Sequence, residues 1–187
     1  MIRLTSGNFR GRTLRTVGGQ TTRPTQAKLR QALFNSLQME IPDARVLDLF
    51  AGCGALGFEA LSRGASQVVF VESSSAAVKV IRENALTLKV IDQIQIIHHP
   101  LPEAIDRVFR WAPFDLVLAD PPYEESWEER LLNDLPWEKL LSSGNKFCLE
   151  WGVQKSKISS LPDETSLLTK VREKEYGDSR LTHFQKK

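Results

Sequence analysis

Four consecutive residues, Asp120, Pro121, Pro122 and Tyr123, place a carboxylate, two rigid carbonyls and an aromatic ring at the end of an apolar run. Proline lacks an amide hydrogen and biases the preceding residue toward extended backbone, so the carbonyls of Asp120 and Pro121 point out of a stiff turn. Two such acceptors can hold the N–H bonds of an exocyclic amine, a poor nucleophile, in line with a methyl donor. Tyr123 could stack on the base, a contact worth about 1–3 kcal/mol. The turn therefore indicates a site that holds an amino group and, with a methyl donor beside it, methyl transfer.

The stretch VLDLFAGCGALG supplies a second set of candidate residues. Gly52, Gly54 and Gly57 satisfy G-x-G-x-x-G, and Glu72 ends the next apolar run, where an acid can bind ribose hydroxyls. The same fingerprint fits NAD, whose pyrophosphate would lie over the helix N-terminus. Asp48 would repel a pyrophosphate but suits the α-ammonium group of S-adenosylmethionine. The loop therefore favours S-adenosylmethionine, while Glu72 fits either ligand.

The residues around these motifs predict the elements that position them. Runs rich in β-branched residues predict strands at 45–50, 67–72, 94–98, 114–119 and 146–151. Longer amphipathic segments predict helices near 56–63, 74–89, 102–110 and 126–141. Because hydrophobicity is continuous within the strands, we expect a parallel sheet covered on both faces. The prediction is an α/β, doubly wound, Rossmann-like domain, whose ligands bind beyond the C-terminal ends of the strands.

Further elements flank this core. Residues 1–16 predict a basic hairpin around a glycine-containing turn, and RPTQAKLRQALFNSL predicts a helix with leucines along one face. The segment SLLTKVREKEYGDSRLTHFQ predicts an antiparallel hairpin that turns at residues 176–178. We expect an N-terminal arm over residues 1–22 and a catalytic domain over residues 23–187.

The composition is that of an ordinary globular chain. Its 187 residues are 41% hydrophobic and 26% charged, and no apolar run reaches the roughly 20 residues that a membrane helix needs. The first residues lack an apolar secretory signal, so we expect a cytoplasmic protein without a membrane partner. Cys53 and Cys148 show neither CxxC nor Cys/His spacing, which predicts neither a disulfide framework nor a metal site.

Charge is distributed unevenly along the chain. Residues 1–39 hold seven Arg or Lys and no acid, whereas residues 40–169 hold 12 basic and 20 acidic residues. A basic arm on an acidic body predicts a polyanion such as nucleic acid at one face, although a solvated tail gives the same pattern.

Together these motifs resemble the bacterial small-subunit (16S) ribosomal RNA guanine-N2 methyltransferases, a class I family. The stretches NFRGRTL, TRPTQAKLRQALFNSL, DLFAGCGALG, LADPPY and EKEYGDSRL occur in the order of that family and span nearly the whole chain. The resemblance implies the class I methyltransferase fold, a mostly parallel sheet with a C-terminal antiparallel hairpin, and S-adenosyl-L-methionine as cofactor. It implies a guanine of 16S ribosomal RNA as substrate, within the small subunit or a late precursor. We expect a monomer.

The resemblance also implies roles for individual residues. The catalytic turn consists of Asp120, Pro121, Pro122 and Tyr123. Cofactor contacts fall on Asp48, Ala51, Gly52, Gly54, Glu72, Leu101 and Thr25. RNA contacts fall on Arg10, Arg12 and Arg23, the last of which belongs to a segment that closes over the cofactor and the target base.

The chain departs from this family at two places. Gln31 stands where many relatives carry Glu, so any carboxylate role is lost there. His99 and Pro100 stand where relatives have a Gly-Asp pair whose acid approaches the adenine. Backbone groups, His98 or His99 are the replacements that the sequence leaves for that contact.

Other functions fit parts of the pattern. An adenine-N6 methyltransferase acting on RNA or DNA, or a protein-glutamine methyltransferase, would keep the turn, but those enzymes often have Asn where this chain has Asp120. A nonenzymatic RNA-binding assembly factor would keep the fold. An NAD enzyme would have no evident use for the turn or the basic arm.

Overall fold

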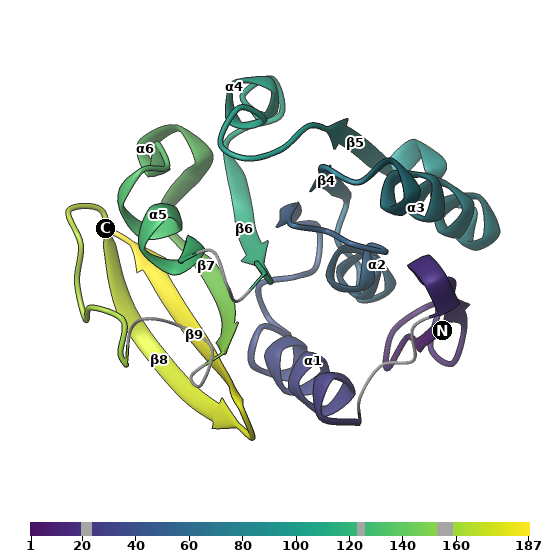
Figure 1. Cartoon of the computed structure of the whole chain (residues 1–187), viewed down its shortest axis with the longest axis horizontal. Helices are drawn as coiled ribbons and strands as arrows, with labels where there is room; N and C mark the ends of the chain where they lie inside the picture. The colour runs from purple at the N-terminus through teal and green to yellow at the C-terminus, as the bar shows by residue number, and fades with distance from the viewer. Residues whose placement is uncertain (20–23, 123–125, 153–158) are drawn as a thin grey trace.

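The computed structural model describes residues 1–19, 24–122, 126–152 and 159–187. At its centre is a seven-stranded sheet in the order β5-β4-β3-β6-β7-β9-β8 (Figure 1). The strands are β3 (Arg45–Leu49), β4 (Gln67–Glu72), β5 (Ile94–His98), β6 (Phe114–Ala119), β7 (Leu141–Gly152), β8 (Leu168–Tyr176) and β9 (Ser179–Lys186). Strands β3 to β7 pair in parallel, and β9 lies antiparallel between β7 and β8. This confirms the predicted α/β fold, with its mostly parallel sheet and C-terminal hairpin.

Helices cover both faces of the sheet, as the continuous hydrophobicity of its strands requires. They are α1 (Pro24–Ser36), α2 (Ala55–Ser62), α3 (Ser75–Leu88), α4 (Ile105–Val108), α5 (Trp127–Asn133) and α6 (Trp137–Leu140), with 3₁₀ turns η1 (Val17–Gly19) and η2 (Ile91–Gln93). One buried cluster packs α1, α2 and α3 against the sheet, and a second packs α4, α5 and α6. Figure 1 shows these two groups of helices on opposite sides of β6 and its neighbours. Within the described segments, no helix is long and apolar enough to cross a bilayer.

The N-terminal hairpin, formed by β1 (Ile2–Arg3) and β2 (Thr13–Leu14), is anchored on α2 by one buried acid. Glu59 is fully buried and accepts hydrogen bonds from the backbone of Thr5 at 2.9 Å and from Arg63 Nε at 2.9 Å. Gly7 has φ +77 and passes so close to α2 that a Cβ there would lie 1.7 Å from the Ser62 carbonyl oxygen. The arm therefore packs into the same core as the sheet, and the boundary predicted after residue 22 lies outside the described residues.

Two predicted helices differ in extent from the observed ones. The segment 126–141 is divided into α5 and α6 because Pro136, at the start of α6, cannot donate a helical hydrogen bond. The segment 102–110 forms only the short helix α4. Strand β7 begins at Leu141 rather than at residue 146, since Leu141 pairs with Phe114 across an irregularity in the register.

Candidate active site

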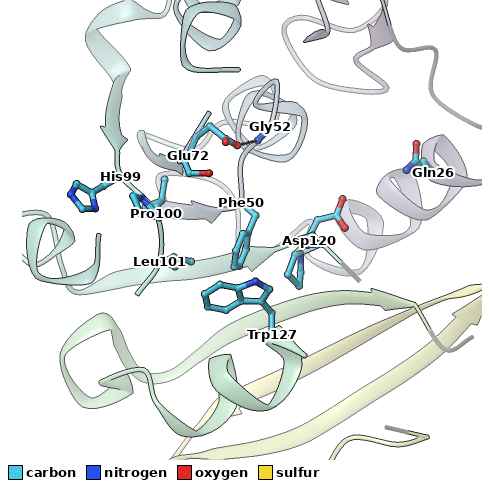
Figure 2. A pocket seen from close by; sticks show the side chains of 13 residues that line it. Gln26, Phe50, Gly52, Glu72, His99, Pro100, Leu101, Asp120 and Trp127 are labelled. Carbon is cyan, nitrogen blue, oxygen red and sulfur yellow. Dashed lines mark hydrogen bonds between the residues drawn. The ribbon is translucent and has the colours of Figure 1, made fainter. Parts of the chain in front are cut away.

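The residues expected to do chemistry meet at the C-terminal rim of the parallel strands. Leu49 pairs with Val71 on one side and with Ala119 on the other. The strands therefore end together and bring Phe50, Glu72 and Asp120 to the same edge of the sheet. Figure 2 shows these three residues around one pocket.

Glu72 ties the glycine loop to the turn that follows β4. Its Oε2 accepts the Gly52 N–H at 2.7 Å (Figure 2). Its Oε1 accepts the Ser74 N–H at 2.7 Å. An ionised carboxylate has about four lone-pair positions, so each oxygen can accept one more hydrogen bond from a ligand. Gly52 has φ +55, and a Cβ built there would meet nothing within 4 Å. The backbone at Gly52 thus faces open space, as a loop that holds a ligand requires.

Asp48 lies beneath the loop rather than on a cavity wall. It is 1% exposed, and its Oδ2 accepts the Gly57 N–H at 2.9 Å, which fixes the first turn of α2. Burial, with smaller contributions from the nearby carboxylates of Asp120 and Glu72, raises the pKa of Asp48 to about 8, although the hydrogen bond from Gly57 opposes this shift. Asp48 is therefore largely protonated at neutral pH, and a cationic group close to it would favour its charged form.

The other predicted loop residues have separate positions. Ala51 is buried and accepts the Gly54 N–H through its carbonyl oxygen at 2.7 Å. Gly54 has φ +82 immediately before α2, a conformation that favours glycine. A Cβ at Gly54 would lie 2.6 Å from the Phe58 ring, so this glycine serves the sharp turn from strand to helix.

A cavity of about 580 Å³ runs along the rim from the end of β5 to the end of β6. Its walls come from the end of β4, from the loops after four strands, and from α1 and α5, with these residues: Gln26, Phe50, Gly52, Val71, Glu72, Ser73, His99, Pro100, Leu101, Asp120, Pro121, Pro122 and Trp127. Phe50 and Trp127 form an edge-to-face pair with ring centroids 4.9 Å apart (Figure 2). The cavity therefore has an apolar floor, a carboxylate near one end and the predicted catalytic turn at the other.

The histidines near Pro100 lie at the β5 end of this cavity. His98 Nε2 is 3.1 Å from the Ser73 carbonyl oxygen, so His98 is already engaged with the neighbouring loop. His99 lines the cavity, and its Nδ1 is buried without a hydrogen-bond partner among the described residues. Leu101 adds an apolar contact on the same wall. This end of the cavity thus combines apolar side chains with a buried imidazole nitrogen.

Asp120 stands where the turn leaves β6. Its side chain is half-buried, and burial raises the pKa of Asp120 to about 6. The carboxylate is therefore mainly ionised at neutral pH and can accept hydrogen bonds or a proton. Tyr123, which we expected to stack on the base, lies outside the described residues.

A second cavity of about 270 Å³ adjoins the first on the side of α1. The two share Gln26, Phe50, Gly52 and Asp120 as a common wall. The second cavity also contains two buried charged residues that were not among the sequence candidates, Arg30 from α1 and Glu150 from β7. Glu150 could have been found from sequence, because it falls near the end of a predicted strand, as Glu72 and Asp120 do.

The expected RNA contacts lie on the arm. Arg10 and Arg12 are exposed in the connection between β1 and β2, and Arg12 Nη2 donates to the Thr87 carbonyl oxygen at 3.2 Å. Arg23 and the side chain of Thr25 lie outside the described residues. Within the described segments, no group of three His, Cys, Asp or Glu residues could hold a metal ion.

Known proteins with a similar sequence or fold include methyltransferases. The family model described as Conserved hypothetical protein 95 matches residues 2–185. Ribosomal RNA small subunit methyltransferase D of Haemophilus influenzae is 32% identical over 168 residues, which cover 89% of this chain and 86% of that protein. The Bacillus subtilis protein YlbH, described as a candidate rRNA methyltransferase, is 30% identical over 187 residues, with both chains covered in full. The solved structure of yhhF, a candidate methyltransferase from Escherichia coli, has a TM-score of 0.83 at 31% identity and covers 100% of this chain and 98% of that one.

Proposed function

Because the chain belongs to the family described as Conserved hypothetical protein 95, which includes small-subunit ribosomal RNA methyltransferases, we propose that it methylates the exocyclic N2 of a guanine in 16S ribosomal RNA. The methyl donor is S-adenosyl-L-methionine. The single observation behind the proposal is that Asp120 and Pro121 line the same cavity as the Glu72 carboxylate, at its other end.

The residues around the first cavity fit this cofactor. Glu72 can accept hydrogen bonds from ribose hydroxyls, while His99, Pro100 and Leu101 can enclose the adenine. The open space at Gly52 admits the part of the molecule between the ribose and the sulfur. When bound, S-adenosyl-L-methionine supplies an electrophilic methyl group on its sulfonium.

The protein contributes placement and charge. The Asp120 carboxylate and the Pro121 carbonyl each accept one N–H bond of the target amine, which fixes the direction of the nitrogen lone pair. Positive charge would grow on that nitrogen as it took the methyl group from the sulfonium, which would leave as a neutral thioether, and the nearby carboxylate would stabilise that charge. The amine then loses one proton. Asp120, with its pKa near 6, can accept that proton and release it to water.

The remaining parts of the proposal concern the RNA contacts, two further cofactor contacts, and the form in which the protein acts. Arg10 and Arg12 of the exposed arm, together with Arg23, contact the RNA backbone, and Tyr123 stacks on the target base. Asp48 faces the ammonium end of the cofactor from below the loop, and Thr25 completes the cofactor site. The protein works as a cytoplasmic monomer on the small subunit or a late precursor, with an arm over residues 1–22 and a catalytic domain over residues 23–187.

Methyl transfer from labelled S-adenosyl-L-methionine to small subunits from cells lacking this protein tests the proposal. The Asp120→Ala variant should lose at least about 10²-fold in kcat/KM, because one preorganised acceptor is removed from the reacting amine. A Glu138→Gln variant, altered at an exposed position of α6, is the matched control and should keep full activity. Equal activity of Asp120→Ala and the control would refute the role of the turn.

A further inference from the structure

The second cavity lies directly beside the proposed acceptor of the amine. Ala119, the last residue of β6, pairs with Leu149 of β7. The next residue in each segment, Asp120 and Glu150, therefore lie side by side. Successive side chains of a strand point to opposite faces. Leu118 and Cys148, two residues earlier, both belong to the core beneath α1 and α2. The carboxylates of Asp120 and Glu150 therefore face the same side of the sheet, toward α1.

Figure 2 agrees with this placement. The Asp120 carboxylate points toward helix α1 and away from the Phe50 and Trp127 rings. A group held by Asp120 thus lies at the junction of the two cavities, with the cofactor cavity on one side and the second cavity on the other.

A buried cation lies opposite these acids. Arg30 of α1 is 5% exposed, and its Nη2 donates to the Arg3 carbonyl oxygen at 2.9 Å. Its Nε is buried and has no hydrogen-bond partner among the described residues, since Glu59 Oε2 is 3.8 Å away. Burial lowers the pKa of Arg30, and the charges of Glu59 and Glu150 oppose that effect. The second cavity thus holds a buried guanidinium with an unused donor and a buried carboxylate.

We propose that the second cavity receives the target base and that Glu150 and Arg30 determine its identity as guanine. This inference rests on the proposed function. With N2 of guanine held by Asp120, the adjacent N1–H donates to the Glu150 carboxylate, and O6 accepts from the Arg30 guanidinium. Along this edge of guanine, N2, N1 and O6 then face Asp120, Glu150 and Arg30 in that order.

The same arrangement rejects adenine. N1 of adenine bears a lone pair that would face the Glu150 carboxylate, and its C6 bears an amine rather than a hydrogen-bond acceptor for Arg30. The adenine lone pair and the carboxylate would repel each other, and Arg30 would meet a second donor in place of an acceptor, which together cost far more than the loss of an ordinary contact. Sites built to hydrogen-bond one substrate reject an analogue without the matching group by about 10⁴-fold to 10⁵-fold.

A base analogue separates this role from a structural one. The substrates are reconstituted small subunits that carry either guanine or 2,6-diaminopurine at the target nucleotide, once that nucleotide is mapped. Diaminopurine keeps the 2-amino group that receives the methyl. Its N1 has a lone pair in place of the hydrogen, and its C6 has an amine in place of the carbonyl oxygen.

The wild type should prefer guanine over diaminopurine in kcat/KM by a factor on the order of 10⁴. Glu150→Gln should lower that preference at least about 100-fold, because the amide of Gln can donate to N1 of diaminopurine. Arg30→Lys should lower kcat/KM for guanine roughly 10-fold to 100-fold, because Lys loses the planar fork of donors. Glu138→Gln should keep the wild-type preference.

Calorimetric titration with S-adenosylhomocysteine shows whether the cofactor site is intact. Its affinity should stay within about twofold of wild type in both cavity variants. A preference unchanged in Glu150→Gln would overturn the inference. A loss of S-adenosylhomocysteine affinity in either variant would also overturn it, since it would assign the second cavity to the amino-acid end of the cofactor. A wild type that methylates neither substrate would refute the proposed function itself.

Discussion

The raised pKa of Asp120 predicts a pH dependence of methyl transfer between pH 5 and pH 7. With its pKa near 6, Asp120 is about nine-tenths ionised at pH 7 and about one-tenth ionised at pH 5. Only the ionised carboxylate can both accept the amine N–H and stabilise the developing positive charge. The value of kcat/KM should therefore fall about tenfold between pH 7 and pH 5, with a slope of one proton.

The assay is the initial rate of methyl transfer to small subunits at low concentrations of cofactor and RNA, where kcat/KM reports the groups of the free enzyme. Asp120→Asn is the informative variant, because Asn keeps one acceptor oxygen but cannot titrate. Its activity should be lower and should not change between pH 5 and pH 7. A wild-type rate that is constant over this range would refute the role of Asp120 as the ionised acceptor. An equal fall in Asp120→Asn would place the titrating group elsewhere.

Four further predictions concern stability, cofactor binding and RNA binding. The pKa of Asp48 is raised from 3.8 to about 8 on folding, so this group lowers stability by about 1.4 kcal/mol per unit as pH rises between those values. Asp48→Asn should therefore gain stability over wild type from pH 5 to pH 8 in urea unfolding, and a constant difference would contradict that pKa. Glu72→Ala should weaken S-adenosylhomocysteine binding by about 10-fold to 100-fold in calorimetry, since charged hydrogen bonds to ribose and to the loop are lost. Unchanged affinity would refute a role of Glu72 in cofactor binding. Gly7→Ala should lower the melting temperature far more than Gly11→Ala, because both have positive φ but only Gly7 lies against the backbone of α2; similar losses would mean that this close approach is unimportant. Arg12→Ala should reduce the slope of log affinity for RNA against log salt by about 0.7–0.9, and an unchanged slope would exclude Arg12 as a phosphate contact.

Much of the architecture follows from local pattern. Continuous apolar runs separated by amphipathic segments identify five parallel strands, and the strand-end rule brings Glu72 and Asp120 to one rim before any coordinates are known.

The second cavity depends on information that local pattern lacks. Arg30 reaches the rim only because α1 packs across the sheet, and Glu150 stands beside Asp120 only through the register of β6 with β7. The pairing of Phe50 with Trp127 likewise joins residues far apart in the chain. Such contacts follow from tertiary packing, which a single sequence does not specify position by position. The functional roles of all the candidate residues stay predictions, and Tyr123 and Arg23 also lie outside the described residues.

The identity of the methylated nucleoside tests the central claim most directly. Small subunits from cells lacking the protein are incubated with S-adenosyl-L-methionine and the purified chain, and their 16S ribosomal RNA is digested to nucleosides for mass analysis. We predict N2-methylguanosine at one mapped position, present after incubation with the wild type and absent after incubation with Asp120→Ala. Appearance of N6-methyladenosine instead, or no new methylated nucleoside, would contradict the account.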